Sequence, residues 1–124
     1  MAYEVKAHTN ILKYNAGWVA MPVTVTNTGI VADSDGKKII PAGTPLEASS
    51  GTIRTAGSTA KACATGANAE GLLFNEVDVT AGSVTGSMLI EGTIDGPKLP
   101  SMPTGTAAAL KPFGIHIIGA YTEA

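Results

Sequence analysis

The most regular pattern in this sequence lies between residues 70 and 95 (EGLLFNEVDVTAGSVTGSMLIEGTID). Two runs of alternating residues, 71–79 and 87–95, are separated by a segment rich in Gly, Ser and Thr. This arrangement is typical of two strands joined by a turn. No other part of the chain carries as much regular alternation. The sequence therefore predicts a β-hairpin here, and we expect the rest of the fold to be organised around it.

Both faces of the predicted hairpin carry apolar side chains. In strand 71–79, Leu73 faces one side whereas Leu72 and Phe74 face the other, because successive side chains of a strand point in opposite directions. In the second strand, one face is predicted to hold Met88, Ile90 and Ile94. We therefore expect one end of the hairpin to be covered twice, by the core and by either the C-terminal strand or a neighbouring subunit.

The rest of the chain predicts further short strands, separated by turn signals at intervals of about ten residues. Strands are expected within 19–28, where Pro22 favours an edge position, within 38–48 around a Pro-Ala-Gly turn, and at 113–120. One short helix is expected at 106–111. The length of 124 residues suits one domain. We predict a mainly β, compact single domain of barrel or sandwich type, with about six to eight strands.

Residues 1–18 show no sustained period and are expected to form an extended N-terminal arm, with the β-rich domain spanning 19–124. The arm contains Tyr14 and the only tryptophan of the chain, Trp18. Aromatic side chains supply contact area at low entropy cost, so an arm of this composition suits docking on another surface. The alternative is that both aromatic residues anchor the core of the protein itself.

Charged residues make up only 15% of the chain, and a small domain with so few charges often buries surface in an oligomer. The net charge is −2, the basic residues are scattered and Arg54 is the only arginine. Nucleic-acid binding is therefore not expected, because it needs a cluster of cations. No apolar run approaches the roughly 18 residues of a membrane span. The single cysteine, Cys63, excludes an internal disulfide.

The sequence contains no nucleophile motif, phosphate-binding loop, zinc-binding helix motif or dinucleotide fingerprint. His116 lies between two isoleucines of a predicted strand, and the Asp33–Lys37 turn lacks the acidic residue that a calcium loop needs at its twelfth position. Four acidic residues on the predicted hairpin form either a cation or acid–base site or a solvated face: Glu76, Asp78, Glu91 and Asp95. We adopt the solvated face, so no catalytic activity, metal or cofactor is predicted.

Several segments between residues 40 and 119 follow one another in a distinctive order. A Thr-Pro-Leu strand start at 44–46 and a Ser/Gly turn lead to ANAEGLL at 67–73. The strands NEVDVT and MLIEGTID follow, and then a Pro-rich excursion, a short helix and the closing strand FGIHII. This order resembles the lambda-type head decoration proteins, or capsid cement proteins, of tailed bacteriophages.

The resemblance implies a β-tulip-like fold and a homotrimer made in the host cytoplasm. Such trimers sit on the outer surface of an expanded icosahedral head, clamp neighbouring major capsid proteins and stabilise the shell. The N-terminal segment of these proteins reaches toward the capsid, so capsid contacts are expected from Tyr3, Val5, Ile11, Tyr14 and Trp18. Trimer contacts are expected from Leu72, Phe74, His116 and Ile118.

Two other classes of function stay open on the residues alone. One is a carbohydrate- or host-surface-binding β-module, or a head-fibre base on a virion, with aromatic platforms chosen from Trp18, Tyr14 and Tyr121. The strand-like material at 19–40, which the lambda pattern lacks, leaves room for this reading. The other is a small hydrolase that uses the acidic face of the hairpin.

Overall fold

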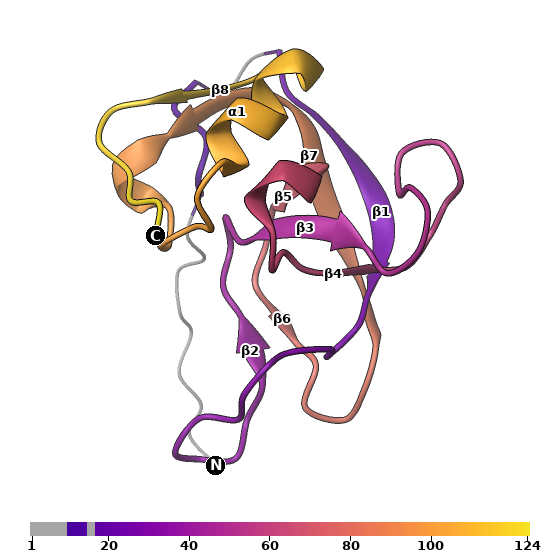
Figure 1. The fold of residues 1–124 in the computed structure, drawn as a ribbon. Helices are drawn as coiled ribbons and strands as arrows, with labels where there is room; N and C mark the ends of the chain where they lie inside the picture. Colours follow the sequence, from indigo (N-terminus) through magenta and orange to yellow (C-terminus); the bar gives the residue numbers. More distant parts are fainter. Residues whose placement is uncertain (1–9, 15–16) are drawn as a thin grey trace.

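The computed structural model describes residues 10–14 and 17–124 (Figure 1). The described residues form eight strands: β1 (Val19–Val25), β2 (Ile39–Ile40), β3 (Pro45–Ala48), β4 (Ala60–Ala62), β5 (Gly71–Leu73), β6 (Val77–Asp78), β7 (Val84–Asp95) and β8 (Ile115–Ile118). They also form one α-helix, α1 (Thr106–Leu110), and three 3₁₀ helices: η1 (Gly66–Asn68), η2 (Gly96–Lys98) and η3 (Lys111–Phe113). The prediction of a mainly β domain with one short helix is confirmed.

Five of the strands close into a barrel, in the order β1-β4-β3-β5-β7 and back to β1. The antiparallel seam between β1 and β7 is long and runs from Val19 opposite Glu91 to Val25 opposite Val84. The seam between β1 and β4 consists of a single parallel pair, Val25 and Ala60. Strand β8 lies outside the ring and pairs in parallel with β7. Strands β2 and β6 form a separate two-stranded sheet.

Pro22 lies in β1 next to this short seam. On one side Pro22 is opposite Ser87 of β7. On the other side, the described part of the chain shows pairing of β1 with β4 only at Val25. Proline cannot donate a hydrogen bond to a strand ladder, so it is tolerated where one side of the strand has no partner. The expected edge character of this strand is therefore present on one side, and it leaves the barrel nearly open there.

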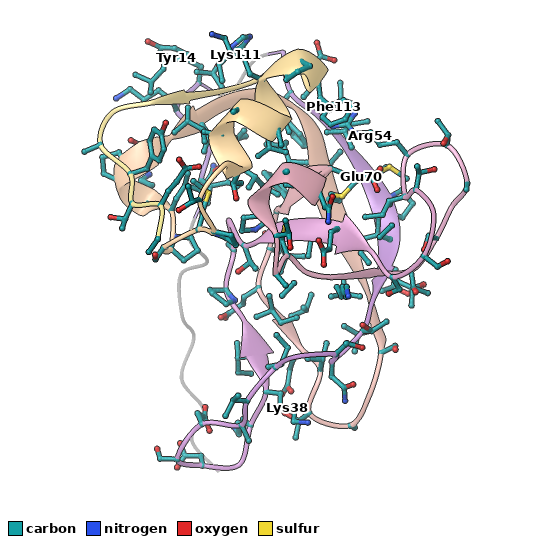
Figure 2. All side chains as sticks on the ribbon, in the orientation of Figure 1. Tyr14, Lys38, Arg54, Glu70, Lys111 and Phe113 are labelled. Carbon is teal, nitrogen blue, oxygen red and sulfur yellow. The ribbon has the colours of Figure 1, made fainter. Side chains whose placement is uncertain are left out.

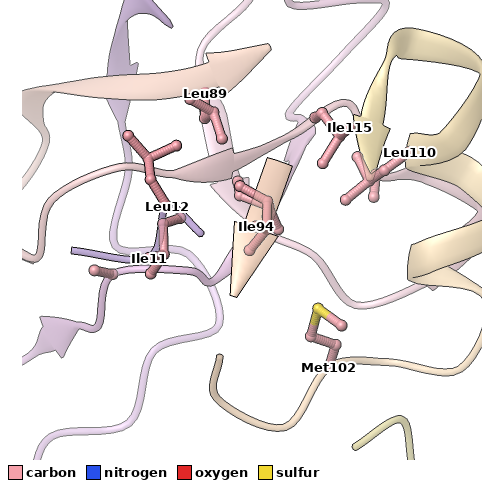
Figure 3. Packing of buried hydrophobic residues seen from close by; sticks show 10 residues of the cluster. Ile11, Leu12, Leu89, Ile94, Met102, Leu110 and Ile115 are labelled. Atoms are coloured by element: carbon pink, nitrogen blue, oxygen red, sulfur yellow. The ribbon is translucent and has the colours of Figure 1, made fainter. Parts of the chain in front are cut away.

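The barrel wall has an apolar core on each side. Inside the ring, the inner core combines side chains from all five barrel strands with neighbours from β2 and the loops: Val23, Val25, Ile40, Leu46, Ile53, Ala60, Leu73, Val79 and Met88. Outside the ring, the outer core lies between β5, β7 and the C-terminal segments: Ile11, Leu12, Ala42, Ala69, Leu72, Leu89, Ile94, Met102, Leu110 and Ile115 (Figure 3).

The two cores explain why the predicted hairpin is apolar on both faces. Leu73 packs in the inner core and Leu72 in the outer core, and both have 0% exposed surface. The expectation that one end of the hairpin is covered twice is confirmed. The second cover is supplied by the chain itself, because α1, β8 and residues 11–12 contribute the other side of the outer core.

The expected strand 71–79 is interrupted, which corrects the prediction of one continuous element. The amide of Phe74 donates to the carbonyl of Ser87 at 2.8 Å, and the chain then leaves the barrel wall. Strand β5 stays beside β7, whereas β6 pairs with β2. The alternation still holds across the bend because Leu73 and Val79 both pack in the inner core. Because the apolar alternation continues across the bend, the sequence does not show that the chain pairs first with β7 and then with β2.

The predicted face of the second strand is also wrong in part. Along β7, the pairing with β1 skips Ile90, so the register shifts by one residue. Such a β-bulge inverts the alternation of side chains beyond it. Met88 and Ile90 therefore pack on the inner core, whereas Ile94 joins Leu89 in the outer core.

The described part of the N-terminal segment is held on the barrel at Ile11 and Leu12. Leu12 forms an isolated antiparallel bridge with Ile94, and the amide of Asp95 donates to the carbonyl of Ile11 at 2.8 Å. Ile11 has 0% and Leu12 has 7% exposed surface. This part of the expected arm therefore belongs to the outer core, which moves the start of the folded domain toward the N-terminus. Residues 1–9 of the expected arm lie outside the described residues.

The C-terminal segments cover the outer core in the expected order. Helix α1 begins after Gly105, which has a left-handed φ of 96°, and it continues directly into η3 with Pro112 in the first turn. Strand β8 then pairs with β7, with Ile115 buried and His116 and Ile118 exposed. The alternation predicted for this strand is confirmed.

Candidate functional site

The residues expected to contact a capsid are not equally available at the surface. Tyr14 is 56% exposed and Trp18 is 38% exposed. Ile11 is fully buried in the outer core, so it has no surface left for a partner and is withdrawn as a contact residue. Tyr3 and Val5 lie outside the described residues.

Trp18 and Phe74 form a stacked aromatic pair, with ring centroids 4.9 Å apart and an interplanar angle of 20°. Phe74 in turn packs against the outer core. Gly92 makes room for this arrangement, because a Cβ on Gly92 would lie 3.2 Å from the Cβ of Trp18. Trp18 is thus both an anchor on its own domain and a partly exposed surface. The stack also joins a residue expected to face the capsid with one expected to face a sibling subunit.

The residues expected at a trimer contact also include both buried and exposed side chains. Leu72 is fully buried by this chain alone, so its assignment to a subunit contact is corrected: the apolar face it belongs to is already occupied. His116 is exposed and Ile118 is 44% exposed on the outward face of β8, the terminal strand of the six-stranded sheet. Tyr121, which follows β8, is 41% exposed.

Two of the four acidic residues of the predicted hairpin, Asp78 and Asp95, serve local structure. Hydrogen bonds from the hydroxyl and amide of Thr80 lower the pKa of Asp78, which closes the turn after β6. Asp95 forms a 3.9 Å ion pair with Lys98. Among residues 10–14 and 17–124, no group of three or more His, Cys, Asp or Glu side chains is arranged to hold a metal ion.

The Asp33–Lys37 segment is a turn, as predicted. One carboxylate oxygen of Asp33 accepts hydrogen bonds from the amides of Asp35 at 2.9 Å and Lys37 at 3.0 Å. Gly36 has a φ of 77°, which is the left-handed conformation that such a turn requires. The first carboxylate of the candidate calcium loop thus closes the turn through two backbone hydrogen bonds to one of its oxygens.

A network around Arg54 was not predicted from the sequence. The Glu70 carboxylate accepts hydrogen bonds from the amides of Ile53 at 3.0 Å and Arg54 at 3.2 Å. The Arg54 guanidinium donates to the carbonyls of Glu70 and Ile90, both at 2.8 Å, and lies 3.9 Å from the ring centroid of Phe113. Burial lowers the pKa of Arg54, and the carboxylates of Glu70 and Glu91 oppose that shift.

A pocket of about 570 Å³ lies beside this network, on the outer surface of β3 and β4. Figure 2 labels three residues of this region, Arg54, Glu70 and Phe113. We call it the β3–β4 pocket, and its lining is Glu47, Ala48, Gly51, Thr52, Lys61, Ala67, Asn68, Ala69, Glu70, Ala109 and Phe113. Its deepest charged group is Glu47, which is only 6% exposed and lies 3.5 Å from Lys61 on the neighbouring strand. The pocket was missed because its lining comes from five separate stretches of chain with no common motif.

Cys63 lies next to Glu47 and is held as a neutral thiol. Its Sγ donates to the carbonyl of Thr65 at 2.9 Å and lies 3.6 Å from a carboxylate oxygen of Glu47. Burial and the negative charge of Glu47 raise the pKa of Cys63 to about 12. A thiol of this pKa is a poor nucleophile, since the thiolate is the reactive form.

We expect Cys63 to react with a disulfide reagent at pH 8 at least about a hundredfold more slowly in the folded protein than in denaturant. The raised pKa also implies that its contribution to stability is complete below the ordinary value of 9.0 and declines as the pH rises toward 12. Stopped-flow absorbance with and without urea measures the rates, with Cys63→Ala as the blank. Equal rates in the two states would contradict the proposed protonation of the thiol.

No protein-family model and no curated protein matches this sequence. None of the helices in the described ranges is long and apolar enough to span a membrane. The arrangement of the described residues supports binding surfaces of two kinds. One kind is formed by exposed apolar side chains around Trp18 and β8, and the other is the polar β3–β4 pocket.

Proposed function

We propose that this protein is a capsid decoration protein that binds the outer surface of an expanded icosahedral phage head as a homotrimer and stabilises it. The observation that carries the proposal is the order of segments between residues 40 and 119. In the structure these segments are β3, η1, β5, β6, β7, α1 and β8, which together form most of the barrel and, with residues 11–12, the cover of the outer core.

The distribution of exposed apolar side chains supports two separate contact surfaces. Tyr14, Trp18 and Val19 are exposed where the chain enters the barrel, and Ile118 and Tyr121 are exposed on and after β8. A stable interface buries about 800 Å² per partner, so two interfaces would cover about a quarter of the 6860 Å² surface of this chain. We assign the first surface to the capsid and the second to the trimer.

Stabilisation by such a protein is a matter of mass action. A ligand that binds the expanded shell but not its precursor shifts the equilibrium toward the expanded form. At a free concentration one hundred times the dissociation constant, each occupied site adds about 2.7 kcal/mol. A shell with many equivalent sites sums these contributions, so a small domain without catalytic chemistry is sufficient for this role.

We expect the purified chain to have three times the 12.5 kDa mass of one chain when measured by light scattering at micromolar concentration. Ile118→Asp should convert the trimer to monomers, because it places a charge in an apolar contact. The matched control is Val31→Asp, since Val31 is 88% exposed in the loop between β1 and β2. A monomeric parent chain, or equal mass for both variants, would count against the trimer surface.

The same preparations test binding to heads. The parent trimer should sediment with expanded heads of the phage that carries the gene, and not with unexpanded heads. Tyr14→Ala should weaken this binding about tenfold or more without changing the mass of the trimer, since aromatic anchors carry much of the energy of an interface. If expanded heads retain neither the parent protein nor the Tyr14→Ala variant, the proposed function is wrong.

A further inference from the structure

The β3–β4 pocket has a built polar wall that the decoration role does not use. Glu47 is almost fully buried at its base, and its position is held by Lys61 across the β3–β4 ladder. Glu70 is held by the amides of Ile53 and Arg54. Two carboxylates fixed in this way are preorganised acceptors, which lowers the entropy cost of binding a ligand.

The charges of the lining favour a neutral ligand. The pocket presents the carboxylates of Glu47 and Glu70 and the ammonium group of Lys61, and the guanidinium of Arg54 lies behind Glu70. Positive and negative charges therefore nearly balance, so a phosphate or another multivalent anion gains nothing from entering. Asn68 adds an amide that both donates and accepts hydrogen bonds.

Apart from Gly51 and Thr52, the remainder of the lining is apolar. Ala48, Ala67, Ala69 and Ala109 have small side chains that leave the space open, and Phe113, a residue that is 40% exposed, adds an aromatic side chain. Figure 2 shows Arg54, Glu70 and Phe113 on the same side of the molecule. The volume of about 570 Å³ lies within the range of roughly 300–1,000 Å³ for small-molecule sites.

We propose that the β3–β4 pocket binds a short neutral saccharide. A saccharide combines hydroxyl groups, which both donate and accept hydrogen bonds, with apolar C–H faces. The hydroxyl groups match the carboxylates, the Lys61 ammonium and the Asn68 amide, and the C–H faces match the alanines and Phe113. The site shares no residue with the Trp18–Phe74 stack or with the exposed face of β8. This activity would therefore be an addition to head decoration.

The test is a ¹H–¹⁵N NMR titration of the full chain with maltose, cellobiose, lactose and N,N′-diacetylchitobiose. At least one of these should give saturable shifts at millimolar concentration, centred on the amides of Thr52, Lys61 and Asn68. Absence of saturable shifts with all four saccharides would overturn the proposal, as would shifts centred outside the pocket. Neither result would affect the decoration role, which is measured by trimer mass and head binding.

Variants make the assignment specific. Asn68→Ala removes an exposed side chain of the lining and should weaken binding about tenfold, the loss that one or two hydrogen bonds produce. Asn75→Ala is the matched control, because Asn75 is also exposed but does not line the pocket. Lys61→Ala gives a second measurement on the opposite wall. Unchanged affinity in both Asn68→Ala and Lys61→Ala would overturn the proposal.

Discussion

Leu72→Asp is expected to unfold the protein, and not only to separate its subunits. Leu72 has 0% exposed surface in the outer core and lies opposite Leu89 across the β5–β7 ladder. A carboxylate at this position would be buried without a partner, which costs several kcal/mol in addition to the lost apolar contacts. We expect a loss of at least about 4 kcal/mol in the free energy of unfolding, close to the whole stability of a small domain.

Circular dichroism during urea unfolding measures this loss, and Leu72→Ala keeps the experiment quantitative if the aspartate variant does not fold. The alanine variant should cost about 2–5 kcal/mol. Ile118→Asp is the matched control, because the same change on the exposed face of β8 should leave the midpoint of unfolding nearly unchanged at low protein concentration. A folded Leu72→Asp protein that has lost only its trimer would contradict the two-core fold.

The sequence predicts that Leu72 is covered, but it does not predict by what. The sequence correctly predicts the two apolar faces of the 71–79 segment, because a period of two is visible in the residues themselves. The identity of the second cover was not visible. Burial by α1, β8 and residues 11–12 depends on where the chain returns, and a sibling subunit would leave the same pattern in the sequence.

The β-bulge at Ile90 is a second feature that the sequence alone does not predict. A one-residue shift of register inverts every side chain beyond it, and no residue type is required at the bulge. The pattern from Met88 to Ile94 therefore suggested one shared face, although the two residues lie in different cores. Only the pairing with β1 reveals the shift.

The β3–β4 pocket and the Arg54 network could not be predicted from the sequence either. In the sequence Arg54 is informative only as the single arginine, which argues against nucleic-acid binding. Its partners lie 16 and 36 residues away along the chain, at Glu70 and Ile90. Short motifs carry no information about such distant partners. By contrast, the Asp33–Lys37 turn was predictable because every contact that defines it is local.

Gly66→Ala is expected to separate the C-terminal cover from the barrel. Gly66 is buried at the start of η1, and a Cβ there would overlap the backbone carbonyl of Thr104 and approach the amide nitrogen of Thr106 to 2.7 Å. Backbone atoms at the start of α1 cannot move aside as a flexible side chain can. The change should therefore displace α1 and cost about 3 kcal/mol, at the upper end of the range for overpacking.

Gly66→Ala should also lower protection from hydrogen exchange more in the C-terminal cover than in the barrel. Leu110 of α1 belongs to the outer core, whereas no residue of α1 belongs to the inner core. Hydrogen exchange followed by mass spectrometry should therefore show lost protection in α1 and β8, with β1 and the first half of β7 still protected. Saccharide binding should weaken as well, because Ala67, Asn68 and Ala109 line the β3–β4 pocket on both sides of this contact.

Gly51→Ala is the matched control for Gly66→Ala. Gly51 also lines the β3–β4 pocket, and a Cβ at this position meets no atom within 4 Å. Its φ of 71° makes alanine strained, at a cost of about 1–2 kcal/mol, but nothing is pushed apart. Gly51→Ala should thus lower the free energy of unfolding without selective exposure of α1 and β8.

Equal loss of protection in the barrel and in its cover for Gly66→Ala would mean that the two cores unfold as one unit, and that the outer core is not a separable layer.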